Sequence, residues 1–168
     1  MEIEIRKEEN KDIEQVRELL RIAFPTDAES RLVDALRANG KAVVSLVAVD
    51  KDRVLGHILF SPVVPTPPGD STGLGLAPVA VDPSVQSQGI GSRLIREGLH
   101  RCRDGGYDYC VVLGDPNYYR RFGFEKASEF GLENEYAVDS EFMVTRFSNR
   151  NLAQGVVRYA PEFSIFSV

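Results

Sequence analysis

The sequence predicts one α/β domain, with a β-sheet flanked by helices, over residues 1–168. Three observations support this prediction. Short apolar stretches rich in β-branched residues alternate with segments whose apolar residues recur at helical spacing. A glycine-rich turn joins a central apolar stretch to an amphipathic helix. At 168 residues, 43% of them hydrophobic and 27% charged, the chain can bury one core of ordinary size.

The N-terminal part predicts one strand followed by two helices. Residues 2–6 alternate apolar and charged side chains, which is typical of a half-buried strand. Residues 12–24 carry apolar side chains at helical spacing, and Pro25 stops that helix. The Thr-Asp pair after this proline can cap a second helix, which ends before Gly40.

Three strands are expected next. Residues 43–49 and 54–64 predict the two strands of a hairpin, with a turn at Lys51 and the aspartate after it. Residues 65–70 contain three prolines, which have no N–H to donate to a ladder, and are expected to form an exposed loop. Residues 74–81 are apolar, end in β-branched residues, and predict a central strand.

The C-terminal half continues the alternation of helices and strands. The expected segments are a helix to about residue 103, a strand at 107–113, one helical turn at 118–121, a strand at 122–125, an acidic loop at 129–141, and strands at 142–147 and 156–159. Up to residue 147, the resulting order is β-α-α-β-β-β-α-β-α-β-β.

The glycine-rich turn after the central strand predicts an anion-binding site. It consists of Gln86, Ser87, Gln88, Gly89, Ile90, Gly91 and Ser92. Such a turn, where it opens a helix, presents backbone N–H groups at the positive end of the helix dipole. Two glycines also let a bulky phosphate approach the backbone, where a Cβ would block it.

The spacing of this turn argues against two nucleotide-binding motifs. A Walker A loop requires a lysine directly after its last glycine, and no lysine follows Gly91. A dinucleotide fingerprint requires a third glycine three residues later, where Leu94 stands. The pattern that remains is Gln-x-x-Gly-x-Gly.

This pattern resembles the pyrophosphate-binding loop of the GNAT (GCN5-related) N-acetyltransferases. Residues 76–83 look like the central strand of that family, and residues 107–116 look like its fifth strand. Residues 119–124, Tyr-Arg-Arg-Phe-Gly-Phe, resemble its shortened fourth helix and Tyr-x-x-x-Gly-Phe signature. The order of elements matches over nearly the whole chain, and Leu-Gly-Asp-Pro with Tyr-x-Arg-Phe-Gly-Phe is similar to the bacterial YhbS-like predicted acetyltransferases.

The resemblance implies the family's fold, a mixed, mostly antiparallel sheet that splays between its central strands 4 and 5. It also implies acetyl-CoA as the acyl-donor cosubstrate, without a metal. The pantetheine arm would pair with the backbone of Val79, Ala80 and Val81, but not with Pro78, which has no N–H. The pyrophosphate would lie on the N–H groups of the turn at residues 86–92.

Tyr119, four residues before Gly123 as in the family, is the candidate general acid. A phenol of pKa ~10 beside a thiolate of pKa ~8.5 can share or deliver a proton. The alternative is a tyrosine that only packs between strands. The neighbouring Tyr118 is a rival, although successive residues of a turn point in different directions.

The general base is not identified by the sequence. The central strand, residues 74–81, has no ionisable side chain. Asp115 is a candidate near the splay, but Asp-Pro-Asn also caps or turns a chain, and a cap equally explains Asn117. His57 is expected as a satisfied histidine on a sheet face, and His100 as a surface residue. An ordered water is a further candidate.

The acceptor is expected to be selected by residues 24–31, 65–73 and 129–141, the segments where the resemblance gives least help. The last of these is acidic, with Glu129, Glu133, Glu135, Asp139 and Glu141. These carboxylates could attract a cationic amine, or they could only solvate a loop, which is the expectation favoured here.

Composition excludes several classes of function. With 20 basic and 25 acidic side chains, a net charge of −5 argues against a nucleic-acid binder. No apolar run approaches the ~20 residues of a membrane span, and the N-terminus lacks a signal-peptide pattern. Two cysteines, Cys102 and Cys110, without a CxxC or His/Cys cluster, predict reduced thiols in a cytoplasmic protein and no metal site.

The expected function is therefore transfer of an acetyl group from acetyl-CoA to an amine of a small molecule or protein. The alternative is a non-catalytic acyl-CoA-binding sensor or structural module with the same fold. Transfer of a longer acyl group, or transfer to a hydroxyl, also remains open. A homodimer through edge strands or the C-terminal segment is consistent with the resemblance.

Overall fold

The computed structural model describes residues 1–166 and contains most of the expected helices and strands, with several additions. The strands are β1 (Glu4–Lys7), β2 (Val44–Asp50), β3 (Arg53–Thr66), β4 (Gly73–Val81), β5 (Tyr109–Leu113), β6 (Glu125–Lys126), β7 (Leu132–Asn134), β8 (Phe142–Arg146) and β9 (Gly155–Tyr159). The α-helices are α1 (Ile13–Ala23), α2 (Ala28–Ala38), α3 (Ile90–Asp104) and α4 (Pro116–Tyr119). Short 3₁₀ helices are η1 (Asn10–Asp12), η2 (Pro83–Val85), η3 (Arg120–Phe122), η4 (Ala127–Phe130) and η5 (Pro161–Phe166).

The chain divides into two compact units. Unit 1 comprises residues 1–60, 77–98 and those from 161 onward, and unit 2 comprises residues 61–76 and 99–160. Strands β3 and β4 and helix α3 each have residues in both units. The hydrogen-bonded strand order is β1-β2-β3-β4-β5-β8-β6. The mixed, mostly antiparallel sheet that the resemblance implied is therefore confirmed.

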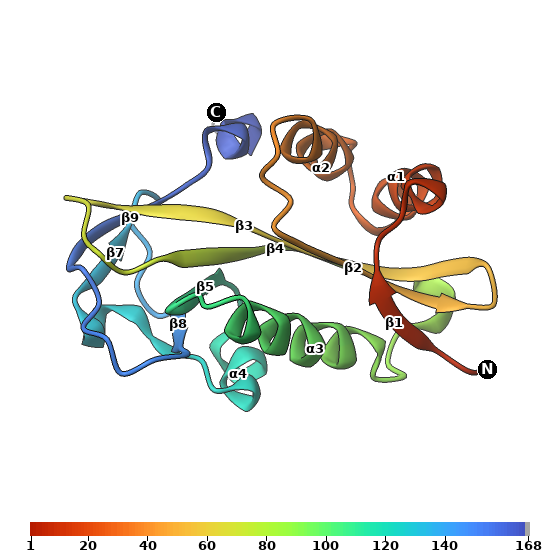
Figure 1. The fold of residues 1–168 in the computed structure, drawn as a ribbon. Helices are drawn as coiled ribbons and strands as arrows, with labels where there is room; N and C mark the ends of the chain where they lie inside the picture. The colour runs from red at the N-terminus through yellow and green to blue at the C-terminus, as the bar shows by residue number, and fades with distance from the viewer. Residues whose placement is uncertain (167–168) are drawn as a thin grey trace. The chain divides into compact units, whose positions relative to one another are not determined.

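In unit 1 the strands β1, β2 and β3 form an antiparallel sheet with helices on both faces (Figure 1). Helices α1 and α2 cover one face and the first half of α3 covers the other. Gly56 of β3 marks the α3 face, since a Cβ there would lie 2.9 Å from Leu94 Cδ1 and 3.1 Å from Ile90 Cγ2. Close approach of the helix to the strand therefore requires a residue without a side chain at position 56.

Unit 2 is built around the short parallel pairing of β4 with β5. This pairing joins Gly73 to Tyr109, Leu74 to Cys110, and Gly75 to Val111. Strand β5 continues the sheet through antiparallel β8, which also pairs with β6. The outer part of β3 pairs with β9, which in turn pairs with β7 in parallel.

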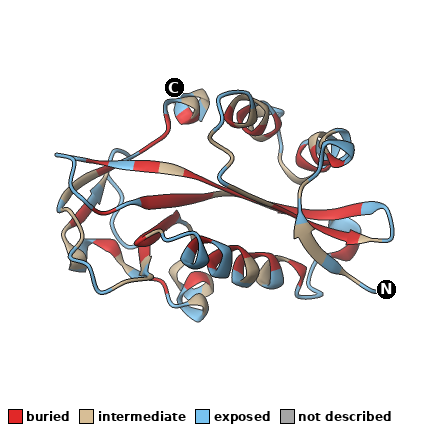
Figure 2. Cartoon of the chain, in the orientation of Figure 1, coloured by how far each residue is buried: buried red, intermediate tan, exposed pale blue. Residues whose placement is uncertain are grey.

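In unit 2 the strands carry most of the buried side chains, whereas in unit 1 strands and the inner faces of helices share them, and the outer faces of the helices are exposed (Figure 2). Burial in α1 follows the predicted spacing, with Val16, Leu19 and Leu20 inside. Cys102 and Cys110 are both buried and free, as expected, and burial raises the pKa of the Cys102 thiol to about 12. Among residues 1–166, no helix is long and apolar enough to span a bilayer.

Three local expectations are wrong. Pro65 is not in an exposed loop, because β3 continues to Thr66 and Pro65 is buried opposite Val157 of β9. A proline costs a strand only one donor, and the pairing carries on around it. Residues 122–125 do not form one strand, since η3 extends to Phe122 and ends at Gly123, whose φ is 92°. The acidic segment 129–141 contains the unpredicted strand β7, which is too short to show periodicity.

Candidate active site

The parallel pairing of β4 with β5 ends at Gly75 and Val111, whereas β4 itself continues for six more residues. The strand therefore has a backbone edge, beyond Gly75, that β5 does not pair with in the described part of the chain. Along it, Pro78 and Ala80 are buried, while Val79 and Val81 are half-buried. An extended ligand with amide groups could pair with such an edge as an added strand.

A fixed turn connects the end of β4 to the glycine-rich loop. The Asp82 N–H donates to the Leu55 carbonyl at 2.8 Å, which holds the turn onto β3. The Asp82 carboxylate accepts from the Ser84 N–H at 2.9 Å and from the Ser84 hydroxyl at 2.7 Å. Both hydrogen bonds hold the pKa of the Asp82 carboxylate below its usual value, and the bond from the Ser84 N–H has the larger effect. The carboxylate thus serves as the cap of η2.

The loop has the backbone conformation that the glycine pattern predicts. Ser87 has a φ of 65° and Gly89 a φ of 84°, so the chain turns twice through left-handed conformations before α3 begins. The Gly89 carbonyl accepts the first helical hydrogen bond, from the Arg93 N–H at 3.1 Å. Nothing lies within 4 Å of the position that a Cβ of Gly89 would occupy. Open space thus lies directly against this backbone.

The loop and the edge of β4 both belong to unit 1. Gln86, Ser87, Gln88 and Gly89 are exposed, whereas Ile90 is buried and anchors the start of α3. Because α3 has 15 residues, its N-terminus carries a full helix-dipole charge, and the N–H groups of its first turn have no carbonyl within the helix. The arrangement is that of an anion site.

Tyr119 lies in unit 2, on α4, which follows the end of β5 directly. Its ring packs where a side chain on Gly114 would be, since a Cβ there would lie 2.3 Å from Tyr119 Cε2. Phe124 packs edge-on against the ring, with centroids 5.7 Å apart. Burial raises the pKa of Tyr119 to about 12, so the phenol is protonated at neutral pH. It can act as a proton donor.

Two further candidates near Tyr119 have structural roles. The carboxylate of Asp115 accepts from the Asn117 N–H at 3.0 Å, and the Asp115 carbonyl accepts from the Tyr119 N–H at 3.0 Å. Asp115 is therefore the N-cap of α4, and Asn117 is a residue of its first turn. Neither needs a catalytic role to explain its position.

Tyr159 is a residue that the sequence did not single out. A Cβ on Gly75 would lie 2.5 Å from Tyr159 Cε1, so the ring lies against β4 where its pairing with β5 ends. The Tyr159 N–H donates to Glu135 at 3.2 Å, and burial raises the pKa of the phenol well above its usual value. The signal in the sequence was weak, namely a glycine inside an apolar strand.

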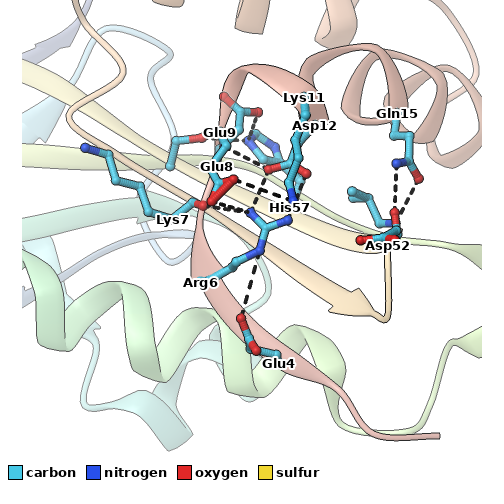
Figure 3. Close-up of polar contacts among 12 residues, drawn as sticks. Glu4, Arg6, Lys7, Glu8, Glu9, Lys11, Asp12, Gln15, Asp52 and His57 are labelled. Carbon is cyan, nitrogen blue, oxygen red and sulfur yellow. Dashed lines mark hydrogen bonds and ion pairs between the residues drawn. The ribbon is translucent and has the colours of Figure 1, made fainter.

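His57 is fully buried and lies on the α1–α2 face of unit 1 (Figure 3). Its Nε2 lies 3.0 Å from the Ser45 hydroxyl and 3.6 Å from Glu8 Oε2. Burial, more than any charge, lowers its pKa to about 4, which keeps the ring neutral at pH 7. The expectation of a histidine on a sheet face is confirmed, but the expectation that it is satisfied is wrong, because its Nδ1 is buried without a hydrogen-bond partner among the described residues. His100 is exposed, as expected, and its Nε2 lies 3.3 Å from Asp104 Oδ2.

No group of three or more potential ligands that could hold a metal occurs among residues 1–166. The candidate chemistry of the described residues thus consists of backbone donors, one strand edge and protonated phenols. Such a set can hold an anionic, extended ligand and deliver a proton, but it contains no evident nucleophile, since burial also raises the pKa of both thiols.

The model of the acetyltransferase (GNAT) family matches residues 13–124. The chain therefore belongs to this family and is an acetyltransferase by class. The matched segment includes β4, the glycine-rich loop and Tyr119.

Individual proteins of this family are similar to the chain over most of its length. The chain is 40% identical over 152 residues to the uncharacterized N-acetyltransferase YhbS of Escherichia coli, covering 88% of this chain and 90% of that protein. A crystal structure of E. coli YhbS in complex with CoA superposes with a TM-score of 0.92 at 37% identity, over 99% of this chain and 94% of the other. A GNAT acetyltransferase from Brucella melitensis in complex with acetyl-CoA gives 0.82 at 38% identity, over 96% and 98%.

Proposed function

We propose that the protein transfers an acetyl group from acetyl-CoA to an amine. One observation carries this proposal: unit 1 contains both a strand edge that β5 does not pair with and an open glycine-rich turn at the N-terminus of α3. A pantetheine arm fits the first and a pyrophosphate fits the second. The CoA and acetyl-CoA complexes of the two similar structures support this assignment.

In this proposal the cofactor is held by backbone groups. The amide groups of the arm pair with Val79, Ala80 and Val81. The N–H groups of the loop, from Gln86 to Ser92, bind the pyrophosphate, and each favourable charge–dipole interaction contributes about 0.3–1 kcal/mol. These contacts are equally strong in the ground and transition states, so they secure the cofactor without accelerating the reaction.

Tyr119 is proposed as the general acid. The amine nitrogen, after losing its proton, attacks the thioester carbonyl; the C–N bond forms, and the C–S bond breaks. The leaving thiolate takes the proton of the Tyr119 phenol, and the second proton, which the nitrogen loses after the C–N bond has formed, restores the phenol through solvent. The phenol carries its proton at pH 7, whereas burial, which raises its pKa to about 12, makes it a weaker acid than a solvent-exposed tyrosine. Water is proposed as the base, because Asp115 is engaged as a helix cap.

Two measurements test the proposal. Thermal unfolding with millimolar acetyl-CoA is expected to show stabilisation, and its absence would exclude the cofactor assignment. Release of CoA thiol across a panel of amines is expected for the wild type and is expected to fall at least about 100-fold in Tyr119→Phe, with acetyl-CoA affinity unchanged. Binding without turnover of any amine would favour a non-catalytic acyl-CoA sensor instead.

We further propose that residues 1–168 act as one catalytic domain in the cytoplasm. The passage of β3, β4 and α3 from one unit to the other without a linker supports a single domain, and two buried reduced thiols suit a reducing compartment. Limited proteolysis tests the domain: two stable fragments separating at the unit boundaries would contradict it. Light scattering after size-exclusion chromatography tests the homodimer.

A further inference from the structure

The ring of Tyr159 lies at the point of β4 where its pairing with β5 ends. The last pair joins Gly75 to Val111, and a Cβ on Gly75 would lie 2.5 Å from Tyr159 Cε1 and 2.9 Å from Tyr159 Cδ1. The backbone of Gly75 does not itself require a glycine, because its φ lies outside the left-handed range. The absence of a side chain at position 75 therefore makes room for the ring.

Contacts of β9 fix the position of this ring. Tyr159 pairs with Val63 of β3, and its side chain reaches past β3 to Gly75 of β4. The Tyr159 N–H donates to Glu135 Oε1 at 3.2 Å. The Tyr136 ring lies beside the Tyr159 ring, with centroids 6.2 Å apart, and only 7% of Tyr159 is exposed. These contacts hold the ring over β4.

The same face of the sheet has an exposed apolar side chain just beyond the last pair. Val111 pairs with Gly75, so its side chain is on the face that the Tyr159 ring covers. Leu113, two residues further along β5, lies on this face too, because side chains alternate along a strand. Val111 is fully buried, whereas Leu113 is 36% exposed. Accessible apolar surface thus begins where β4 and β5 stop pairing.

The proposed donor would bring its acyl group to this surface. In acetyl-CoA the pyrophosphate and the thioester are at opposite ends of the pantetheine arm. With the pyrophosphate on the glycine-rich loop and the arm along residues 79–81, the thioester end points along β4 toward Gly75. The residues that an acyl group would meet there, namely Gly75, Val111, Leu113 and Tyr159, all belong to unit 2.

We propose that the Tyr159 ring limits the acyl group of the donor to a short chain. The acetyl methyl would lie against the exposed side of Leu113, and carbon atoms beyond it would meet the ring, which its contacts hold in place. The donor class is therefore a short acyl-CoA, acetyl-CoA or propanoyl-CoA, and longer acyl-CoAs are excluded. This inference rests on the proposed function, since it names the donor for the same transfer.

Calorimetric titration with CoA, acetyl-CoA and butanoyl-CoA tests this proposal without an acceptor. The wild type is expected to bind butanoyl-CoA at least about tenfold more weakly than acetyl-CoA, because the added methylenes meet the ring. Tyr159→Leu removes the ring and is expected to bring the two affinities within about threefold of each other, whereas Tyr159→Phe keeps the ring and the wild-type ratio. Equal affinity of the wild type for both thioesters, or an unchanged ratio in Tyr159→Leu, would overturn the proposal.

Tyr109→Leu is the matched control. The Tyr109 ring packs on Gly73 as the Tyr159 ring packs on Gly75, but Gly73 and Tyr109 lie inside the paired part of β4 and β5. Tyr109 is buried, and its hydroxyl has no hydrogen-bond partner among residues 1–166, so leucine removes packing alone. This variant is expected to lose stability but to keep the wild-type ratio of affinities. An equal change of the ratio in both leucine variants would overturn the specific role of Tyr159.

Leu113→Phe tests the same surface without removing a buried ring. The added bulk is expected to weaken acetyl-CoA binding at least about threefold more than binding of CoA, which has no acyl group. Val64→Phe is its control, since Val64 is an exposed residue of β3 in unit 2 whose side chain lies on the face opposite to that of Val63. Equal effects on acetyl-CoA and CoA in Leu113→Phe would overturn the proposal.

The titration with CoA separates this proposal from the proposed function. If the wild type binds neither CoA nor acetyl-CoA, the proposed function is contradicted, and the role of Tyr159 falls with it. If the wild type binds CoA and both thioesters but does not discriminate between acetyl-CoA and butanoyl-CoA, only the role of Tyr159 is contradicted.

Discussion

The two units of this protein stabilise their interiors in different ways. In unit 1, charged side chains tie β1 to the helices: Arg6 makes two hydrogen bonds to Asp12, at 2.7 and 2.9 Å, and Arg37 makes two to Glu8, at 2.9 and 2.8 Å. In unit 2, tyrosine rings pack on glycines, with the pairs Gly73–Tyr109, Gly75–Tyr159 and Gly114–Tyr119.

This difference parallels the proposed division between cofactor binding by residues of unit 1 and proton donation by Tyr119 of unit 2. The ion pairs of unit 1 fix the sheet that carries the exposed backbone donors of the glycine-rich loop. The aromatic surroundings of unit 2 keep phenols out of water, and burial raises the pKa of both Tyr109 and Tyr119 to about 12. Backbone N–H groups of a loop are accessible to a ligand from solvent, whereas the buried phenols of unit 2 are largely withdrawn from it.

The largest expected effect concerns His57 and the pH dependence of stability. Because burial lowers the pKa of His57 from 6.5 to about 4, the unfolded chain binds a proton that the folded protein does not between these values. Stability should therefore fall as the pH drops from about 6.5 to about 4, by about 3 kcal/mol at most. Urea unfolding of the wild type and of His57→Gln across this range measures it.

The variant His57→Gln is expected to show a flatter pH dependence than the wild type. His100→Gln is the control, because it removes a histidine that is exposed on α3 rather than buried. Equal slopes in the wild type and His57→Gln would show that the histidine in unit 1 does not control stability.

The next effect concerns the glycine–tyrosine packing of unit 2. Gly75→Ala places a Cβ 2.5 Å from the Tyr159 ring, which must then shift, and is expected to cost about 1–3 kcal/mol of unfolding free energy. Gly105→Ala is the control, since its nearest neighbours are at 3.3–3.4 Å. A similar loss of stability in both variants, measured by urea unfolding, would argue against a specific role of this packing.

A matched pair of glycines distinguishes backbone strain from cofactor binding. Gly89 and Gly106 have φ values of 84° and 85°, and neither would have a neighbour within 4 Å of an added Cβ. Alanine at either position should cost about 1–2 kcal/mol of stability through backbone strain alone. Only Gly89→Ala is expected also to weaken acetyl-CoA binding, measured by calorimetry. Equal acetyl-CoA affinity in the two variants would remove the loop from the cofactor site.

The smallest effect concerns the cap of α4. Asp115→Ala removes the carboxylate that accepts from the Asn117 N–H and is expected to cost about 1 kcal/mol of stability. Asp115→Asn retains an accepting oxygen and should restore most of it. If Asp115→Asn regains stability but loses turnover at least tenfold at constant acetyl-CoA affinity, Asp115 is a base as well as a cap.

Local patterns predicted much of this molecule. The glycine-rich loop depends on φ values and a helix start that lie within a few neighbouring residues, so Gln86 to Ser92 could be read directly. The same holds for α1 and α2, because their apolar residues recur at helical spacing over several turns. Strand β7 could not be found in this way, since three residues give no period and its partner β9 lies more than twenty residues further along the chain.

By itself, the sequence determined most of the order of elements, the conformation of the glycine-rich loop and the family, because each depends on residues close together in the chain. Only the tertiary structure decided the environment of these groups. Burial of Tyr119 and His57 and the position of the Tyr159 ring on Gly75 depend on contacts between distant segments, since solvent exclusion arises only when those segments pack together.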